Sequence, residues 1–265
     1  MMMNTNTSSE FLNLANELAD TARPIAMHYF KEGVSSTQKS DNSPVTVADQ
    51  EIETKLRDMI MERFPDHGIL GEEYDSINLD AKYVWVLDPI DGTHCFSVGF
   101  PIFGTMIALL EDGKPILGVI DAPAMDDRWI GIKGQPSTLN GQPIKTKACA
   151  NLDQAWITSS SPFMFEEGAQ RESYNKLQHS SSQRPVFSGN CVAYGLIASG
   201  KLDIVCEADL GVYDFMAVIP IIEGAGGVVT DWQGDTLTME SEGVVLASGD
   251  PKLHQEAIKV LTGQK

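Results

Sequence analysis

Two aspartates close together offer the clearest chemistry in this sequence. Asp88 and Asp91 belong to the segment Asp88-Pro89-Ile90-Asp91-Gly92-Thr93, which follows an apolar run that predicts a buried strand over residues 83–87. The strand is expected to end at Asp88, and the chain to turn through the glycine into a helix that begins at Thr93. Two carboxylates held this close repel each other unless a cation lies between them. The segment therefore indicates a cation site at the end of a strand.

Further oxygen ligands lie close by in the sequence. Glu72, within Gly71-Glu72-Glu73, follows another short apolar run, and the carbonyl of Ile90 lies between the two aspartates. An all-oxygen set with no nearby His or Cys is typical of a hard ion such as Mg²⁺. The alternative is an ordinary turn, in which Asp side chains accept hydrogen bonds from backbone N–H groups, and an isolated D-P-x-D-G motif would favour it.

A late segment supports the metal interpretation and points to a family. Tyr213-Asp214 is followed by Glu223-Gly224-Ala225-Gly226-Gly227. Together with Gly71-Glu72-Glu73 and residues 88–93, in this order and spacing, it resembles the inositol monophosphatase superfamily of Mg²⁺-dependent phosphatases over roughly residues 11–261. The resemblance implies a mixed α+β (α/β) fold, a layered αβαβα sandwich of the inositol monophosphatase/fructose-bisphosphatase type. The family's usual Trp-Asp is Tyr213-Asp214 here, which retains the carboxylate and changes the wall beside it.

The resemblance also implies roles for individual residues. The groups that would hold two or three Mg²⁺ ions are Glu72, Asp88, the Ile90 carbonyl, Asp91 and Asp214, with Asp88 shared between two ions. The catalytic group would be Asp49, Thr93 and Glu72, of which Asp49 and Thr93 hold and deprotonate the attacking water. Taken without the resemblance, Asp49 and Thr46 would be a helix-capping pair.

The metal motifs do not separate the family's substrates, which include inositol phosphates, fructose bisphosphate, adenosine bisphosphates and histidinol phosphate. Several weaker segments together resemble the histidinol-phosphatase branch: Phe103-Gly104-Thr105, Asp127-Arg128-Trp129, Ser161-Pro162-x-Met164-Phe165, Asn190-Cys191-x-Ala193-Tyr194-Gly195-Leu196 and Tyr213-Asp214-Phe215. We expect a histidinol-phosphate phosphatase of histidine biosynthesis. The alternatives are an inositol-1-monophosphatase or a related small sugar or nucleotide phosphatase, and a non-catalytic regulatory binding protein, which the complete ligand set disfavours.

The residues expected to bind substrate are Gly92, Thr93, Asn190, Glu207 and Asp214. Backbone N–H groups of Gly92 and Thr93 at a helix N-terminus would face the phosphate. Histidinol phosphate carries an amine and an imidazole, so its pocket should offer an anion or an acceptor. Where the histidinol-phosphatase branch tends to have a carboxylate before the cysteine, this chain has the neutral Asn190, and Glu207 or Asp209 could supply the charge. Arg128 could either contact substrate or form a structural ion pair.

Composition restricts the partners and the compartment. The 265 residues carry a formal net charge of -18, which argues against binding nucleic acid through its phosphates. The four cysteines are too scattered for a zinc site and too few for a disulfide framework. No apolar run approaches the ~20 residues that span a bilayer, and the first nine residues do not resemble a signal peptide. We expect a cytoplasmic protein with a small phosphorylated substrate and no membrane partner, and the resemblance suggests a homodimer.

The elements that must position these residues fall into two halves. Residues 1–149 predict two amphipathic helices, with Ile52, Leu56 and Ile60 on the inner face of the second, and an antiparallel sheet with hairpins at Asp112-Gly113 and Asn140-Gly141. This half would carry most metal ligands. The polar residues 33–42 predict a loop.

Residues 150–265 alternate between strands and helices, which predicts an α/β half that carries Asp214 and a wall of the substrate pocket. Strands are expected at residues 156–158, 202–206, 228–229 and 244–246. Helices are expected at residues 166–177, 192–199, 215–223 and 253–261.

Overall fold

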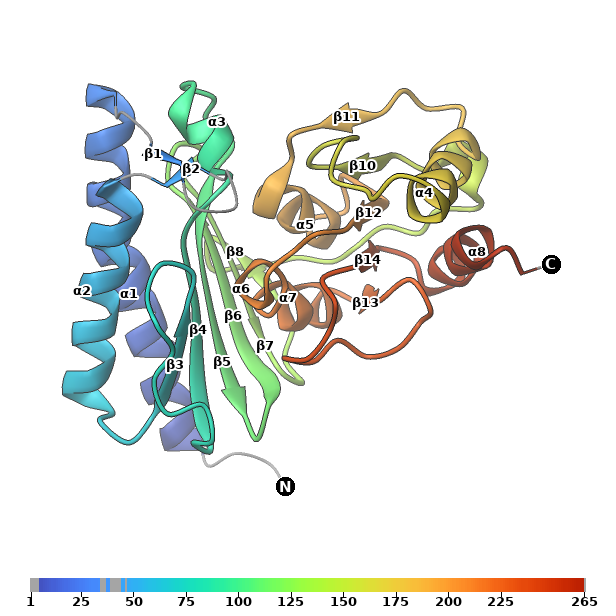
Figure 1. Cartoon of the computed structure of the whole chain (residues 1–265). Coiled ribbons are helices and arrows are strands. Elements are labelled where there is room, and N and C mark those ends of the chain that lie inside the picture. The colour runs from blue at the N-terminus through green and yellow to red at the C-terminus, as the bar shows by residue number, and fades with distance from the viewer. Residues whose placement is uncertain (1–4, 34–36, 39–43, 46, 265) are drawn as a thin grey trace.

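The computed structural model describes residues 5–33, 37–38, 44–45 and 47–264. Figure 1 shows five layers across the molecule: long helices, a large sheet, a group of short helices, a second sheet and outer helices. This αβαβα order confirms the expected fold class. The loop expected over residues 33–42 lies for the most part outside the described residues, as does Thr46 of the capping pair.

The first layer consists of two helices that pack against each other and against one face of the large sheet: α1 (Thr5–Glu32) and α2 (Val47–Arg63). On α2, Ile52, Leu56 and Ile60 recur every four positions and are fully buried, as the helical spacing predicts. Between the two helices the structure describes one short antiparallel pair, β1 (Thr37–Gln38) with β2 (Pro44–Val45).

The large sheet contains seven strands that follow one another in chain order: β3 (Gly68–Gly71), β4 (Tyr83–Asp91), β5 (Gly104–Glu111), β6 (Lys114–Ala122), β7 (Asp127–Ile132), β8 (Thr138–Leu139) and β9 (Gln142–Pro143). The expected antiparallel sheet is confirmed except at its first pair, since β3 and β4 are parallel. Both predicted hairpins are present. Asp112, Gly113, Asn140 and Gly141 have φ between 49° and 76°, the left-handed backbone that two-residue hairpin turns require.

The remaining layers come from the second half of the chain. The second sheet has the order β11-β10-β12-β14-β13, with β10 (Ile157–Ser159), β11 (Val186–Phe187), β12 (Ile204–Glu207), β13 (Val228–Thr230) and β14 (Val245–Ser248). The middle helices are α5 (Asn190–Ala198), α6 (Val212–Phe215) and α7 (Val218–Gly224). The outer helices are α4 (Ala169–His179) and α8 (Pro251–Thr262), and a 3₁₀ turn, η1 (Leu152–Gln154), precedes β10.

Two expectations for this half were wrong in detail. The edge strand β11 was missed, because a pair of residues carries too little pattern to be recognised. The single helix expected over residues 215–223 is divided into α6 and α7. Pro220 has no N–H to continue a helix from α6, and it lies instead in the first turn of α7, where that N–H is not needed.

One hydrophobic core joins the two sheets through the middle helices. It contains buried side chains from the large sheet, such as Trp129, and from the second sheet, such as Ala247. A Cβ atom at Gly118 would lie 2.0 Å from the Ala217 carbonyl oxygen, and one at Gly131 would lie 2.3 Å from the backbone of α7. Glycine on β6 and β7 thus lets α7 lie directly on the sheet. Within the described ranges, no helix combines the length and apolar character needed to cross a bilayer.

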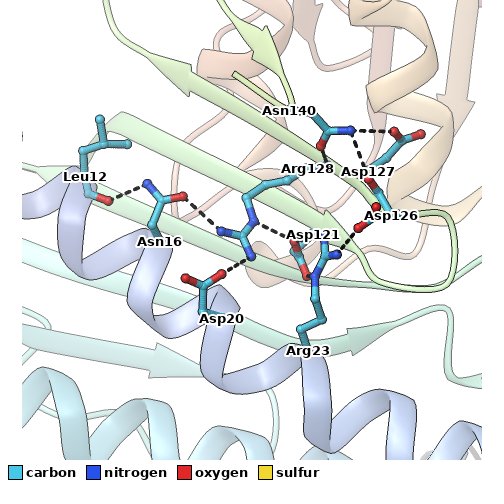
Figure 2. A network of polar contacts seen from close by, with 9 residues as sticks. All are labelled: Leu12, Asn16, Asp20, Arg23, Asp121, Asp126, Asp127, Arg128 and Asn140. Carbon is cyan, nitrogen blue, oxygen red and sulfur yellow. Dashed lines mark hydrogen bonds and ion pairs between the residues drawn. The ribbon is translucent and has the colours of Figure 1, made fainter. Parts of the chain in front are cut away.

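A polar network fastens α1 to β6 and β7 of the large sheet (Figure 2). The carboxylate of Asp121, on β6, is fully buried and accepts hydrogen bonds from Arg23 at 2.8 and 3.1 Å and from Arg128 at 2.6 Å. Arg128 also contacts Asp20 at 2.7 Å and Asn16 at 3.1 Å, both on α1. Of the two roles considered for Arg128, the structure supports the ion pair.

We predict that Asp121→Asn lowers the free energy of unfolding by about 3 kcal/mol, because it leaves two half-buried guanidinium groups without their shared buried anion. Asp126→Asn is the matched control, since the Asp126 carboxylate contacts Arg23 at 2.5 Å from an exposed position. We expect the control to cost less than about 1 kcal/mol. Equal effects of the two substitutions in urea unfolding would contradict this account.

Candidate active site

A bulge in β4 places Asp88 and Asp91 on the same face of the sheet. Asp88 pairs with Met106 and Asp91 with Gly104, so β4 contains one residue more than β5 between these pairs. In a regular strand, residues three apart point to opposite faces, and one additional residue restores the same face. The expectation that the strand ends at residue 87 was therefore wrong. It continues to Asp91 because Pro89, which has no N–H for the ladder, is accommodated in the bulge.

Asp214 approaches the two aspartates from the middle layer. It belongs to the short helix α6, and its carboxylate accepts a hydrogen bond of 2.7 Å from the N–H of Gly211, which caps that helix. Carboxylate oxygens of Asp88, Asp91 and Asp214 all lie within 4.8 Å of one another. The structure thus joins two sequence segments that lie more than a hundred residues apart.

Glu72 and Asp49 complete the acidic cluster. Glu72 follows β3, whose last residue pairs with Leu87, so it lies beside the end of β4. Asp49 is buried in the first turn of α2. Burial raises the pKa of Asp88 well above its usual range, and the neighbouring charges raise it further: those of Glu72, Asp91, Asp214 and Asp49. The structure therefore brings together all five predicted carboxylates, and their individual roles as ligands and base stay predictions.

The donor set fits a hard divalent cation. The buried Oδ1 atom of Asp88 has no hydrogen-bond partner among the described residues, and burial of a charged carboxylate without a partner is costly. Burial and the charges of Asp91 and Glu72 also raise the pKa of Asp214 well above its usual range. A cation bound between these oxygens would remove the repulsion, and an all-oxygen set selects an ion such as Mg²⁺. The residues present thus fit the expected metal.

The turn after Asp91 leaves no room for a side chain at Gly92. Gly92 has φ of 85°, and α3 (Thr93–Ser97) begins immediately after it. A Cβ atom at Gly92 would lie 2.6 Å from the side-chain nitrogen of Asn190, so this position requires glycine on both counts. The Thr93 hydroxyl donates a hydrogen bond of 3.0 Å to the carbonyl of Ile90, and a carbonyl oxygen retains a second lone pair for a cation.

Asn190 supports this turn from α5. Its side-chain Nδ2 donates to the Ile102 carbonyl at 3.0 Å and contacts the Cys95 sulfur at 3.4 Å. The neighbouring N–H of Cys191 donates to the carboxylate of Asp91 at 2.5 Å. The start of α5 thus holds both the chain after α3 and one of the clustered aspartates. A pure ligand-binding role for Asn190 does not account for these contacts.

A cavity of about 520 Å³ opens beside the acidic cluster. Its wall includes all five residues expected to bind substrate: Gly92, Thr93, Asn190, Glu207 and Asp214. Asp209 and Glu242 add carboxylates, and none of the lining residues among those described is Lys or Arg. The buried carboxylate of Glu207 accepts hydrogen bonds from the N–H of Ser160 at 2.8 Å, from its hydroxyl, and from the Tyr194 hydroxyl at 2.6 Å.

Some residues of this wall were not found by sequence reasoning. Glu242 lies in the connection between β13 and β14, where no motif or periodicity distinguishes it from a solvated surface residue. Ser160 and Tyr194 lie in or beside segments that were noted for family likeness, yet their link to Glu207 depends on contacts between distant strands and helices. Only the fold shows that they share one wall.

Comparison with known proteins identifies the family. The sequence profile of the inositol monophosphatase family matches residues 7–264. The chain belongs to this family. Among curated members, the bifunctional phosphatase IMPL2 of Arabidopsis thaliana, a chloroplastic protein, is 43% identical over 260 residues, covering 95% of this chain and 75% of that protein. A histidinol-phosphatase of Chlorobaculum parvum is 33% identical over 238 residues, covering 89% of this chain and 92% of the relative.

Solved structures of the family agree with the fold. An inositol monophosphatase from Zymomonas mobilis matches with a TM-score of 0.87 at 40% identity, covering 96% of this chain and 98% of that one. The inositol monophosphatase family relatives are phosphatases, which supports phosphomonoester hydrolysis by this chain. Their names include both histidinol and inositol phosphatases, so family membership by itself does not select the ester.

We predict that Asn190→Asp lowers kcat/KM about tenfold toward every phosphate ester. The substitution removes the Nδ2 donor and leaves the Ile102 carbonyl unpaired, at a cost of about 1–3 kcal/mol. Asn190 has φ of 44°, which Asp also tolerates, so the backbone is not strained by the change. Steady-state kinetics with a cationic and a neutral substrate distinguish the roles. Improved KM for the cationic ester alone would show that residue 190 binds substrate directly.

We predict that Mg²⁺ affinity rises with pH through about pH 6 and does not level off there, because the pKa values of Asp88 and Asp214 are also raised. Burial raises the pKa of Asp91 to about 6, although the N–H of Cys191 opposes this shift. Between the ordinary carboxyl pKa and this value, the metal-free folded protein retains a proton that binding must release, so affinity should rise roughly tenfold per pH unit. Isothermal titration calorimetry between pH 5 and 7.5 measures the Mg²⁺ affinity at each pH. Affinity that is constant across this range would contradict the prediction.

Proposed function

We propose that this chain is a Mg²⁺-dependent phosphatase whose substrate is histidinol phosphate, an intermediate of histidine biosynthesis. The acidic wall of the cavity carries this proposal. Glu207, Asp209 and Glu242 lie outside the predicted ligand set, and the part of the lining that the structure describes contains no Lys or Arg. A phosphate ester with a cationic alcohol suits this wall, because its ammonium and imidazole can be neutralised there.

The chain's own residues divide the work of hydrolysis. Bound Mg²⁺, as two or three ions, would activate a water and stabilise charge on the phosphate and the leaving oxygen. Asp49 accepts the proton of the attacking water, and the Thr93 hydroxyl helps to hold that water while its own proton is directed at the Ile90 carbonyl. The N–H groups of Gly92 and Thr93 bind the phosphate. Glu72, Asp88, Asp91, Asp214 and the Ile90 carbonyl are the proposed metal ligands.

Inositol monophosphate hydrolysis is the second candidate. It is favoured by the similarity to the Zymomonas mobilis structure and by the neutral Asn190. A polyol offers only hydroxyl groups, which the acceptors on Glu207 and Asp209 could also bind. A cytoplasmic location and a homodimer, which we expected from the sequence and the resemblance, complete the proposal.

The deciding experiment compares L-histidinol phosphate with myo-inositol 1-phosphate, first with Mg²⁺ and then with chelator. We expect kcat/KM to favour histidinol phosphate by orders of magnitude and both activities to require Mg²⁺. Preference for inositol phosphate would overturn the substrate. Turnover that is insensitive to chelator would overturn the metal mechanism.

We further predict that Asp209→Asn and Glu242→Gln each raise KM for histidinol phosphate about tenfold and leave KM for inositol phosphate unchanged. Each removes a charge and keeps the shape of the side chain, so about 1.4 kcal/mol of attraction is lost only for a cationic substrate. Asp209 has φ of 58°, which Asn tolerates. Equal effects on both substrates would show that these two carboxylates do not distinguish a cationic substrate from a neutral one.

A further inference from the structure

A buried ion pair lies on α2, beneath the segment that carries Glu72. Arg57 Nε donates to the Glu53 carboxylate at 2.7 Å, and the two residues are one helical turn apart. The Glu53 side chain is 0% exposed and the Arg57 side chain 11% exposed. Neither residue lines the cavity described above. The pair therefore has no contact with the space available to substrate.

The remaining hydrogen bonds of this pair hold three consecutive residues after Glu72. The second carboxylate oxygen of Glu53 accepts the N–H of Glu73 at 2.8 Å. The two terminal nitrogens of Arg57 donate to the carbonyls of Tyr74 at 2.9 Å and Asp75 at 3.0 Å. The Arg57 guanidinium also lies 5.8 Å from the centre of the Tyr74 ring. The second carboxylate oxygen of Glu53 and both terminal nitrogens of Arg57 are thus directed at this one backbone segment.

The segment is fixed from its other side as well. A Cβ atom at Gly71 would lie 1.9 Å from the Glu53 carboxylate, so this carboxylate lies directly against the end of β3. Glu72 is therefore flanked by two residues, Gly71 and Glu73, that both contact Glu53. Gly71 is also paired with Leu87 on β4, next to Asp88. The position of Glu72 relative to Asp88 therefore depends on the contact between Gly71 and the Glu53 carboxylate and on the pairing of Gly71 with Leu87.

The same helix carries Asp49. Asp49, Glu53 and Arg57 are spaced by four residues, which places them along one face of α2, and all three are buried. Any change in the Glu53–Arg57 pair would thus alter the placement of Glu72 relative to Asp49. Stability alone does not explain such a pair, because buried ion pairs are often no more stabilising than well-packed apolar residues.

We propose that Glu53 and Arg57 are positioning residues that set Glu72 against Asp49 and Asp88, and so determine metal affinity without touching substrate. This inference rests on the metal role of Glu72 in the proposed function. The Glu53–Arg57 pair holds the backbone on both sides of Glu72. The Glu72 carboxylate therefore needs no reorganisation when an ion binds.

The test measures Mg²⁺ binding by calorimetry on the whole protein, together with melting temperature and kinetics. We expect Arg57→Lys, which keeps the charge but loses the forked donor, to weaken Mg²⁺ binding about tenfold and raise the Mg²⁺ concentration for half-maximal activity equally. KM for the phosphate ester at saturating Mg²⁺ should not change. Arg63→Lys is the matched control, because Arg63 lies on the same helix as Arg57 and forms an exposed ion pair with Glu17 of α1.

A second variant perturbs the same ion pair without replacing either of its side chains. Gly71→Ala should displace the Glu53 carboxylate and weaken Mg²⁺ binding in the same way, so it serves if Arg57→Lys does not fold. The inference is overturned if either folded variant lowers the melting temperature but binds Mg²⁺ as tightly as the unmodified protein. Failure of the proposed function looks different: there Glu72→Gln itself would leave Mg²⁺ binding intact.

Discussion

Mutual repulsion among buried carboxylates is the constraint on which the rest of the structure depends. Five acidic side chains from four segments meet at the end of β4, and burial raises the pKa of Asp88 and Asp214 well above the usual range. Such a cluster is unfavourable by itself, so the scaffold must hold it together until a cation neutralises it. The layers on either side of the large sheet serve this purpose.

Each layer contributes one part of the restraint. The bulge in β4 aims two aspartates at the same face, and close contact of α7 with glycines on β6 and β7 brings α6 and Asp214 toward them. On the other side, the buried pair on α2 clamps the backbone after Glu72. The network around Asp121 fastens α1 to the sheet, and neither Asp121 nor its two arginine partners line the cavity. The fold thus separates residues that hold the layers from residues that hold the ligands.

Substrate recognition is a separate property of the same cleft. The metal motifs are common to a family with several phosphate esters, and the wall formed by Glu207, Asp209 and Glu242 lies beyond them. Glu207 ends β12, Asp209 follows it, and Glu242 lies in the connection before β14. Under the proposed function, specificity can therefore change by substitution in these segments while the acidic cluster and the large sheet stay constant.

The sequence by itself determined the family, the layered fold, both hairpins and the five carboxylates, because these depend on local patterns: periodic apolar residues, Asp-Gly and Asn-Gly turns, and short motifs in a characteristic order. Tertiary structure decided the bulge at Pro89, the division of the helix at Pro220 and the clamp of Glu53 and Arg57. It also assigned Arg128 to an ion pair and Asn190 to the turn beside Gly92. These features arise between residues far apart in the chain, and a single sequence does not encode them as a local pattern.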